Sequence, residues 1–127
     1  MKALTLIQPW ATLIIDGRKK IETRSWKTKL TGIFAVHAGK KVDTYAAERF
    51  GYDPTQLPTS SILGTAELYD CFQFTENTWE EMRDTEEVKY GDFDVGRYGF
   101  RLQNVIEFEE PISAKSSLGF WEWEGQE

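Results

Sequence analysis

The chain has 127 residues, of which 40% are hydrophobic and 14% aromatic, as is typical of one globular domain. Its only cysteine and only histidine, Cys71 and His37, exclude an internal disulfide, the usual zinc ligand sets and a site built on two histidines. The net charge is −6, yet the segment from Gly17 to Lys41 holds eight basic residues and one acid. A basic segment within an acidic chain indicates an anionic partner.

The sequence shows no membrane-spanning segment. Its longest apolar run, Leu4 to Ile15, is interrupted by Gln8 and Pro9 and is too short to cross a bilayer. The first residues also lack the apolar stretch and cleavage site of a signal peptide. With a single cysteine, this predicts a cytoplasmic protein that has no membrane partner, and we expect neither a metal nor a cofactor.

The first half of the chain is predicted to contain three strands and one helix. Lys2–Ile7 alternates and is rich in strand formers, and Pro9–Asp16 has the apolar spacing of a short helix, which Gly17 ends. Lys20–Lys27 alternates again, and Ile33–Ala38 is a nearly continuous apolar strand. Alternation in the second strand places Glu22, Arg24 and Trp26 on one face and Thr23 on the other.

The second half is predicted to hold helices, long strands and an acidic loop. In chain order we expect a helix at Val42–Phe50, a strand at Ile62–Phe72 bent at Gly64, a helix at Asn77–Arg83 capped by Thr75, an acidic loop at Glu86–Gly96, and strands at Tyr98–Phe108 and Leu118–Trp123. About six strands and two or three short helices, without a repeated βαβ unit, predict a mainly β fold. We expect a small, partly open β-barrel that forms a single domain over residues 1–127.

A compact motif follows the first helix. It consists of Gly17, Lys19, Glu22 and Arg24, in the spacing Gly-x-Lys-x-x-Glu-x-Arg. This spacing is the hallmark of the ASCH domain family, a branch of the PUA-like β-barrel superfamily, and the chain resembles that family. Five further blocks match it in order: Gln8–Ala11, Ser25–Trp26, Val36–Ala38, Gly96–Tyr98 and Leu118–Trp121.

The resemblance implies a cleft between the barrel and the helix that precedes the motif, holding RNA or a nucleotide-like ligand. Some small members of the family look like amidohydrolases of acylated cytidine, in which a lysine activates a threonine three residues later. Here Glu22 occupies that third position after Lys19. The nearest hydroxyl, on Thr23, is expected on the opposite face of the strand.

The motif residues have the chemistry of a ligand site. Lys19 can bind phosphate or, if burial lowers its pKa, act as a base. Arg24 offers a planar fork for phosphate or a base edge, and Glu22 can accept hydrogen bonds from an exocyclic amine. The alternative interpretation is a structural ion pair between Glu22 and Arg24 at the end of the barrel.

Candidate contacts outside the motif are of three kinds: aromatic, imidazole and basic. They are Trp10 and Trp26 for base stacking, His37 on the apolar strand, and Lys40 and Arg97 for charge. Each residue also has a structural alternative. The two tryptophans and His37 would then belong to the core, Lys40 would be exposed to solvent, and Arg97 would pair with a carboxylate. The acids from Glu76 to Asp94 are expected on the solvated surface.

Three functional hypotheses follow. The first is a module that binds RNA or a small nucleotide-like anion over Lys19 and Arg24. The second is a small hydrolase of an acylated nucleoside or of RNA, with Lys19 as base and Glu22 as acid/base catalyst. The third is a domain whose acidic face contacts a protein partner.

Overall fold

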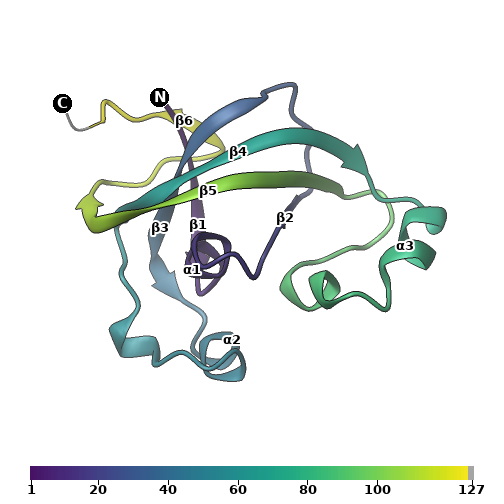
Figure 1. Ribbon diagram of the computed structural model, residues 1–127, viewed down its shortest axis with the longest axis horizontal. Helices are drawn as coiled ribbons and strands as arrows, with labels where there is room; N and C mark the ends of the chain where they lie inside the picture. Colours follow the sequence, from purple (N-terminus) through teal and green to yellow (C-terminus); the bar gives the residue numbers. More distant parts are fainter. Residues whose placement is uncertain (126–127) are drawn as a thin grey trace.

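Six strands form one mixed sheet in the computed structural model, which describes residues 1–125 (Figure 1). The strands are β1 (Lys2–Gln8), β2 (Ile21–Arg24), β3 (Gly32–Val42), β4 (Ser61–Gln73), β5 (Tyr98–Ser113) and β6 (Phe120–Glu122). Their order in the sheet is β2-β5-β4-β3-β1-β6. β1 and β3 run parallel, and the other pairs are antiparallel. The predicted mainly β fold of about six strands is confirmed.

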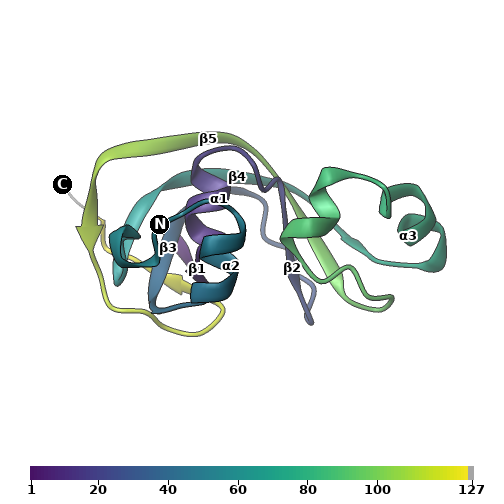
Figure 2. The same ribbon diagram turned by 90° about the horizontal axis from the view of Figure 1, so that it is seen from below.

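Three α-helices and two short 3₁₀ helices connect these strands. They are α1 (Trp10–Ile15), α2 (Thr44–Arg49), η1 (Pro54–Gln56), α3 (Glu76–Met82) and η2 (Glu86–Tyr90). Figure 2 shows α1 and α2 together, with α3 at the far end of the molecule. Among residues 1–125 no helix is long and apolar enough to cross a membrane. Thr75 caps α3 as predicted, in a reciprocal capping box with Thr78.

The sheet curves like a barrel but does not close, because β2 and β6 remain its two edges. The curvature comes partly from the long strands β4 and β5, whose pairing shifts register at Gly64, as the predicted bend requires. A Cβ atom at Gly64 would lie 2.1 Å from the Ile106 carbonyl oxygen, so only glycine fits there. The partly open barrel is therefore confirmed.

The main core lies between the sheet and α1. Leu4, Leu6, Ile14, Phe34 and Phe100 are at most 3% exposed in it. Alternation along β1 explains the arrangement, because Leu4 and Leu6 point into this core while Ala3 packs in a second cluster on the other face. This core fixes α1 on the sheet, and with it the turn that carries the motif.

A third apolar cluster holds the acidic loop, whose acids are exposed as expected, with the exception of Glu87. Phe93 is 3% exposed and packs against Ile21 of β2 and Phe74. Glu87 is not a free surface acid, since its carboxylate accepts hydrogen bonds from the backbone N–H groups of Lys20 and Ile21. The segment Glu86–Gly96 is therefore docked against β2 instead of projecting into water.

The predicted strand Lys20–Lys27 is shorter in the structure. β2 ends at Arg24, and Ser25 and Trp26 form a bend. The Trp26 ring turns into the main core, with its centroid 5.4 Å from that of Phe100 and 5.9 Å from that of Phe120. The strand pattern stops where this large apolar ring is buried.

Candidate functional site

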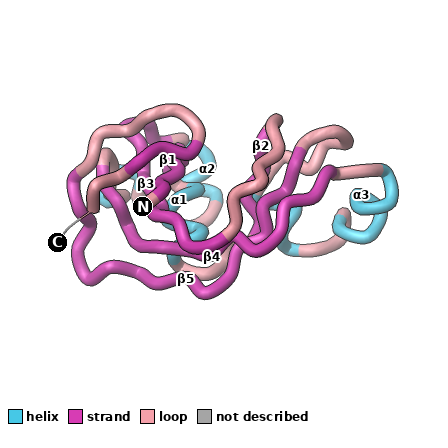
Figure 3. Tube along the Cα trace, turned by 90° about the horizontal axis from the view of Figure 1, so that it is seen from above, coloured by secondary structure: helices cyan, strands magenta, loops and turns pink. Residues whose placement is uncertain are grey.

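A cavity of about 670 Å³ opens at the free edge of β2. Its walls come from Thr5–Ile7 of β1, Trp10 of α1, Glu22–Arg24 of β2, Arg49 of α2 and Val88–Asp92, together with Lys19 and Arg97. Figure 3 shows β2 between the part of the molecule that holds α1 and α2 and the part that holds α3. The cavity thus forms where the N-terminal elements β1, α1 and β2 meet α2 and the segment Val88–Asp92.

The end of α1 positions Lys19. Gly17 has a φ of +85°, which a glycine adopts without strain. The backbone N–H of Gly17 donates to Ile14, and those of Arg18 and Lys19 both donate to the Leu13 carbonyl. This is a Schellman-type end, and it reverses the chain so that the Lys19 side chain enters the protein.

The Lys19 amine is buried and fully hydrogen-bonded. Its residue is 2% exposed, and Nζ donates to the carbonyl oxygens of Ile21 at 2.8 Å and Tyr90 at 2.5 Å. The third neighbour is Oε1 of Glu22 at 3.4 Å. Burial lowers the pKa of Lys19, while the negative charge of Glu22 opposes this shift. Three acceptors match the three N–H bonds of an ammonium group, so the geometry suits a charged anchor better than a free base.

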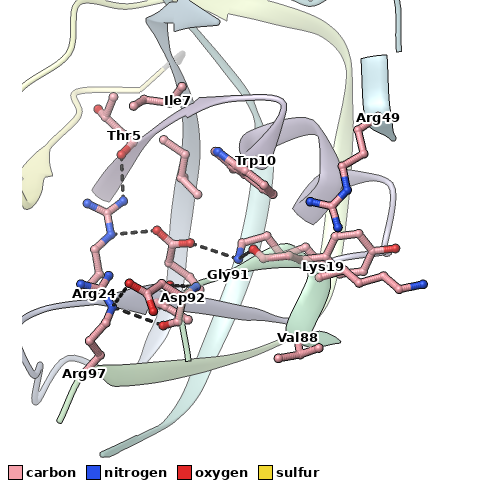
Figure 4. Close-up of a pocket in the computed structure, with 15 residues that line it drawn as sticks. Thr5, Ile7, Trp10, Lys19, Arg24, Arg49, Val88, Gly91, Asp92 and Arg97 are labelled. Atoms are coloured by element: carbon pink, nitrogen blue, oxygen red, sulfur yellow. Dashed lines mark hydrogen bonds and ion pairs between the residues drawn. The ribbon is translucent and has the colours of Figure 1, made fainter. Parts of the chain in front are cut away.

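Glu22 bridges the two cations of the motif. Its Oε2 accepts from Nε of Arg24 at 2.8 Å, while Oε1 faces Lys19. Arg24 also donates from Nη2 to the Thr5 carbonyl oxygen at 2.9 Å (Figure 4). Within residues 1–125 the Nη1 group of Arg24 has no hydrogen-bond partner. The motif therefore forms the ion pair of the structural interpretation, and it does so in the lining of the cavity.

Thr23 also lines the cavity, although strand alternation predicted that its side chain lies on the other face of β2 from Glu22 and Arg24. β2 is an edge strand, so the cavity reaches around its unpaired side. A Cβ atom at Gly91 would lie 3.2 Å from Oγ1 of Thr23 and 3.4 Å from Nζ of Lys19. Gly91 thus lets the docked segment close over both groups.

The cavity is rich in positive charge. Its lining includes five basic residues, Lys19, Arg24, Arg49, Lys89 and Arg97, and two acids, Glu22 and Asp92. Figure 4 shows Arg49 at one end and Arg97 at the other, with Trp10 and Lys19 between them. Nε of Arg97 donates to the Asp92 carbonyl oxygen at 3.2 Å, which holds the guanidinium at the rim. Four of these cations have a carboxylate partner, namely Glu22 for Lys19 and Arg24, Glu86 for Lys89 and Asp92 for Arg97, while Arg49 has none among residues 1–125.

The structure places five of the eight sequence-predicted site residues in the cavity: Trp10, Lys19, Glu22, Arg24 and Arg97. Trp26, His37 and Lys40 lie outside its lining. Trp26 is a core residue, and Lys40 is exposed on β3. His37 is fully buried on the opposite side of β1 from the motif, in contact with Trp121.

His37 is a satisfied core histidine. Nε2 lies 2.6 Å from the Ala114 carbonyl oxygen, which can only accept, so Nε2 carries the proton. Nδ1 then accepts from the Thr5 hydroxyl at 3.0 Å, and that hydroxyl accepts from Nε1 of Trp121 at 3.0 Å. Burial lowers the pKa of His37, and the network holds the ring neutral.

Several cavity residues were absent from the sequence-based prediction. The most informative are Arg49, Thr23, Tyr90 and Gly91. A signal existed for the docked segment, because the apolar residues Val88, Tyr90 and Phe93 interrupt its acids. No signal pointed to Arg49, whose position depends on how α2 packs. Within the described part of the chain, no three His, Cys, Asp or Glu side chains gather as metal ligands would.

Comparison with known proteins gives the same family as the motif. The profile of the ASCH domain matches residues 4–112. Activating signal cointegrator 1 from mouse and from human is 35% identical in an alignment of 81 positions that covers 54% of this chain and 14% of each relative. The match therefore spans only a small part of those proteins.

Solved structures share the fold. The crystal structure of ASCH from Zymomonas mobilis has a TM-score of 0.59 at 21% identity and covers 88% of this chain and 72% of that chain. A tyrosine-to-phenylalanine mutant of the same protein gives 0.60 at 19% identity, with 88% and 74% covered. Because the family profile also spans most of the sequence, the chain belongs to the ASCH domain family.

Proposed function

We propose that the protein binds RNA or a nucleotide-like anion in the cavity beside Lys19, Glu22 and Arg24. The observation that carries this proposal is the charge of the lining. Five basic residues and two acids meet there, in a chain whose net charge is −6. Arginine guanidinium groups and buried cations bind phosphate well. Contacts to phosphate supply much of the affinity of nucleic-acid binding.

Each lining residue is expected to contact a different part of the ligand. Arg24 and Arg97 present guanidinium groups to a phosphate, and Arg24 is held for this by Glu22 and the Thr5 carbonyl. Trp10 offers an aromatic face for a base, and stacking of this kind contributes about 1–3 kcal/mol. Glu22 retains lone pairs that can accept from an exocyclic amine. Lys19 contributes positive charge from its buried position and holds Glu22 through their ion pair.

The ligand is expected to be short. The cavity of about 670 Å³ falls within the usual range of small-ligand sites, about 300–1,000 Å³. The remaining surface is acidic, since the chain carries 21 acids against 15 basic residues. This charge repels a long phosphate backbone away from the cavity. A nucleotide or a few unpaired residues of RNA fit both facts.

The direct test is binding of a fluorescein-labelled hexanucleotide RNA, followed by anisotropy at increasing salt. We expect the dissociation constant to rise with salt, because phosphate contacts release counterions. Arg97→Gln should weaken binding about tenfold, the size of one charge-assisted hydrogen bond. Lys115→Gln, an exposed lysine outside the cavity, is the matched control and should bind as the wild type does. Salt-independent binding, or none at low salt, would contradict the proposal.

One observation favours a second candidate function, hydrolysis of an acylated nucleoside or of RNA. The Thr23 hydroxyl lines the cavity with Lys19 and Glu22, although it follows the lysine by four residues instead of three. Incubation of acylated nucleosides and short RNA with wild type, Lys19→Met and Thr23→Val tests it. Turnover that disappears in both folded variants supports hydrolysis at this site. Equal turnover by all three proteins removes these residues from the mechanism.

A further inference from the structure

A second, smaller cavity of about 280 Å³ adjoins the first. Arg49, Lys89 and Tyr90 line both cavities, so the two adjoin at these side chains. Arg18, Phe50 and Glu86 line the smaller cavity and not the main one. Tyr90 is therefore part of a wall that both cavities share.

Arg18 is held rigidly in the smaller cavity. Its Nη1 donates to the Phe50 carbonyl oxygen at 2.9 Å, and its guanidinium carbon lies 5.8 Å from the Phe50 ring centroid. The same carbon lies 5.6 Å from the Tyr52 ring and 5.9 Å from the Tyr90 ring. An arginine fixed by three aromatic rings loses little conformational freedom when it binds an anion.

The charge of the smaller cavity is only partly neutralised. Among residues 1–125, no carboxylate lies within 4.0 Å of the guanidinium of Arg18 or of Arg49. The one acid in the lining, Glu86, pairs with Lys89 at 3.1 Å. Two guanidinium groups thus share a small space without a counter-ion from the protein, and an anion would supply it.

We propose that the smaller cavity is a second phosphate subsite, which binds the phosphate adjacent to the nucleotide held in the main cavity. This inference rests on the proposed function and makes it more specific. The preferred ligand is a strand of at least two linked nucleotides, because a mononucleotide cannot place a phosphate in both cavities. Arg18 and Arg49 bind the second phosphate, and the Tyr90 ring lies between the two subsites.

The test compares AMP and CMP with the hexanucleotide RNA on wild type and on Arg18→Gln. We expect Arg18→Gln to weaken hexanucleotide binding about tenfold and to leave mononucleotide binding within about twofold. The slope of log K against log salt for the hexanucleotide should fall by about 0.7, the contribution of one phosphate on a single strand. Circular dichroism confirms that the variant is folded.

A second variant avoids any effect on folding. The Glu86 side chain is 70% exposed, so Glu86→Gln should leave the fold intact while it removes the only acid of the smaller cavity. We expect it to strengthen hexanucleotide binding severalfold, and more than mononucleotide binding. Lys115→Gln again serves as the control.

The outcomes separate the two proposals. If Glu86→Gln and a folded Arg18→Gln change mononucleotide and hexanucleotide binding equally, the second subsite is wrong. The proposal that the main cavity binds the nucleotide is then unaffected. Unchanged hexanucleotide binding in Glu86→Gln also overturns the subsite. If wild type binds neither probe at low salt, both proposals fail together.

Discussion

Two polar clusters lie on opposite sides of β1, and each contains a site candidate predicted from the sequence. The charged cluster consists of Lys19, Glu22 and Arg24, and the imidazole cluster consists of Thr5, His37 and Trp121. They even share a residue, since Arg24 donates to the backbone oxygen of Thr5 while His37 bonds to its hydroxyl.

The two clusters differ in what remains unsatisfied. In the imidazole cluster, Nε2 of His37, the Thr5 hydroxyl and the Trp121 indole each have a partner, and His37 lines neither of the two cavities described. In the charged cluster, Lys19, Glu22 and Arg24 all line a cavity, and among residues 1–125 Nη1 of Arg24 has no hydrogen-bond partner. Burial of a polar group therefore does not identify a site. Unused hydrogen-bonding capacity beside an open cavity does.

Removal of the lysine is expected to have the largest effect. Lys19→Met leaves the carbonyl groups of Ile21 and Tyr90 without their donor and breaks a buried ion pair with Glu22. We expect a loss of about 3–5 kcal/mol in the free energy of unfolding, measured by urea denaturation. A loss below about 1 kcal/mol would show that Lys19 is not the structural anchor of the cavity.

The imidazole cluster is expected to govern pH sensitivity and not binding. The pKa of His37 lies below its ordinary value of 6.5, so the unfolded state binds protons more readily than the folded state. Stability from His37 is complete above about pH 6.5 and is lost as the pH falls below it. His37→Gln should cost about 1–3 kcal/mol at about pH 8 and give a flatter stability profile on acidification.

Urea denaturation of both proteins between about pH 5 and about pH 8 measures this difference. RNA binding by folded His37→Gln should equal that of the wild type, because His37 lies outside the cavity lining. Parallel stability profiles in the two proteins, or weaker RNA binding by the variant, would contradict this separation of roles.

The Trp10 side chain is expected to contribute moderately to RNA binding. Trp10→Leu keeps an apolar side chain on α1 but removes the indole face in the cavity. We expect RNA binding to weaken by about 1–3 kcal/mol, the range for one stacked base. The salt dependence should stay the same, since no phosphate contact is lost. A reduced salt slope would instead place a phosphate, not a base, beside Trp10.

The smallest effect is expected outside both cavities. Lys40→Gln removes a positive charge from the basic segment of the sequence, but Lys40 is exposed and lines neither cavity. Solvent screens such a charge, so RNA affinity should change by less than about twofold. A loss as large as that of Arg97→Gln would mean that the basic segment as a whole, and not the cavity, attracts the ligand.

Local patterns in the sequence predicted much of the fold. Alternation predicted β1, apolar spacing followed by Gly17 predicted α1, and Thr75 predicted the start of α3. The motif spacing also predicted that Lys19 and Arg24 act together. These elements and the motif could be predicted because each depends on residues that are close in the chain.

Contacts between distant segments could not be predicted in the same way. The acids around Tyr90 and Phe93 suggested a solvated loop, yet these two rings are buried where the segment docks beside β2. Alternation along β2 did not predict that Thr23 lines the cavity, because the cavity reaches around the free edge of this strand. Arg49 enters the cavity only through the packing of α2 near α1.

The most direct measurement of the central claim uses the indole N–H signals of the five tryptophans in an NMR titration with the hexanucleotide RNA. Trp10 lines the cavity, whereas Trp121 belongs to the imidazole cluster. We expect the Trp10 signal to shift with RNA until saturation, while the Trp121 signal stays in place. A shift of the Trp121 signal without one at Trp10 would contradict binding in the cavity.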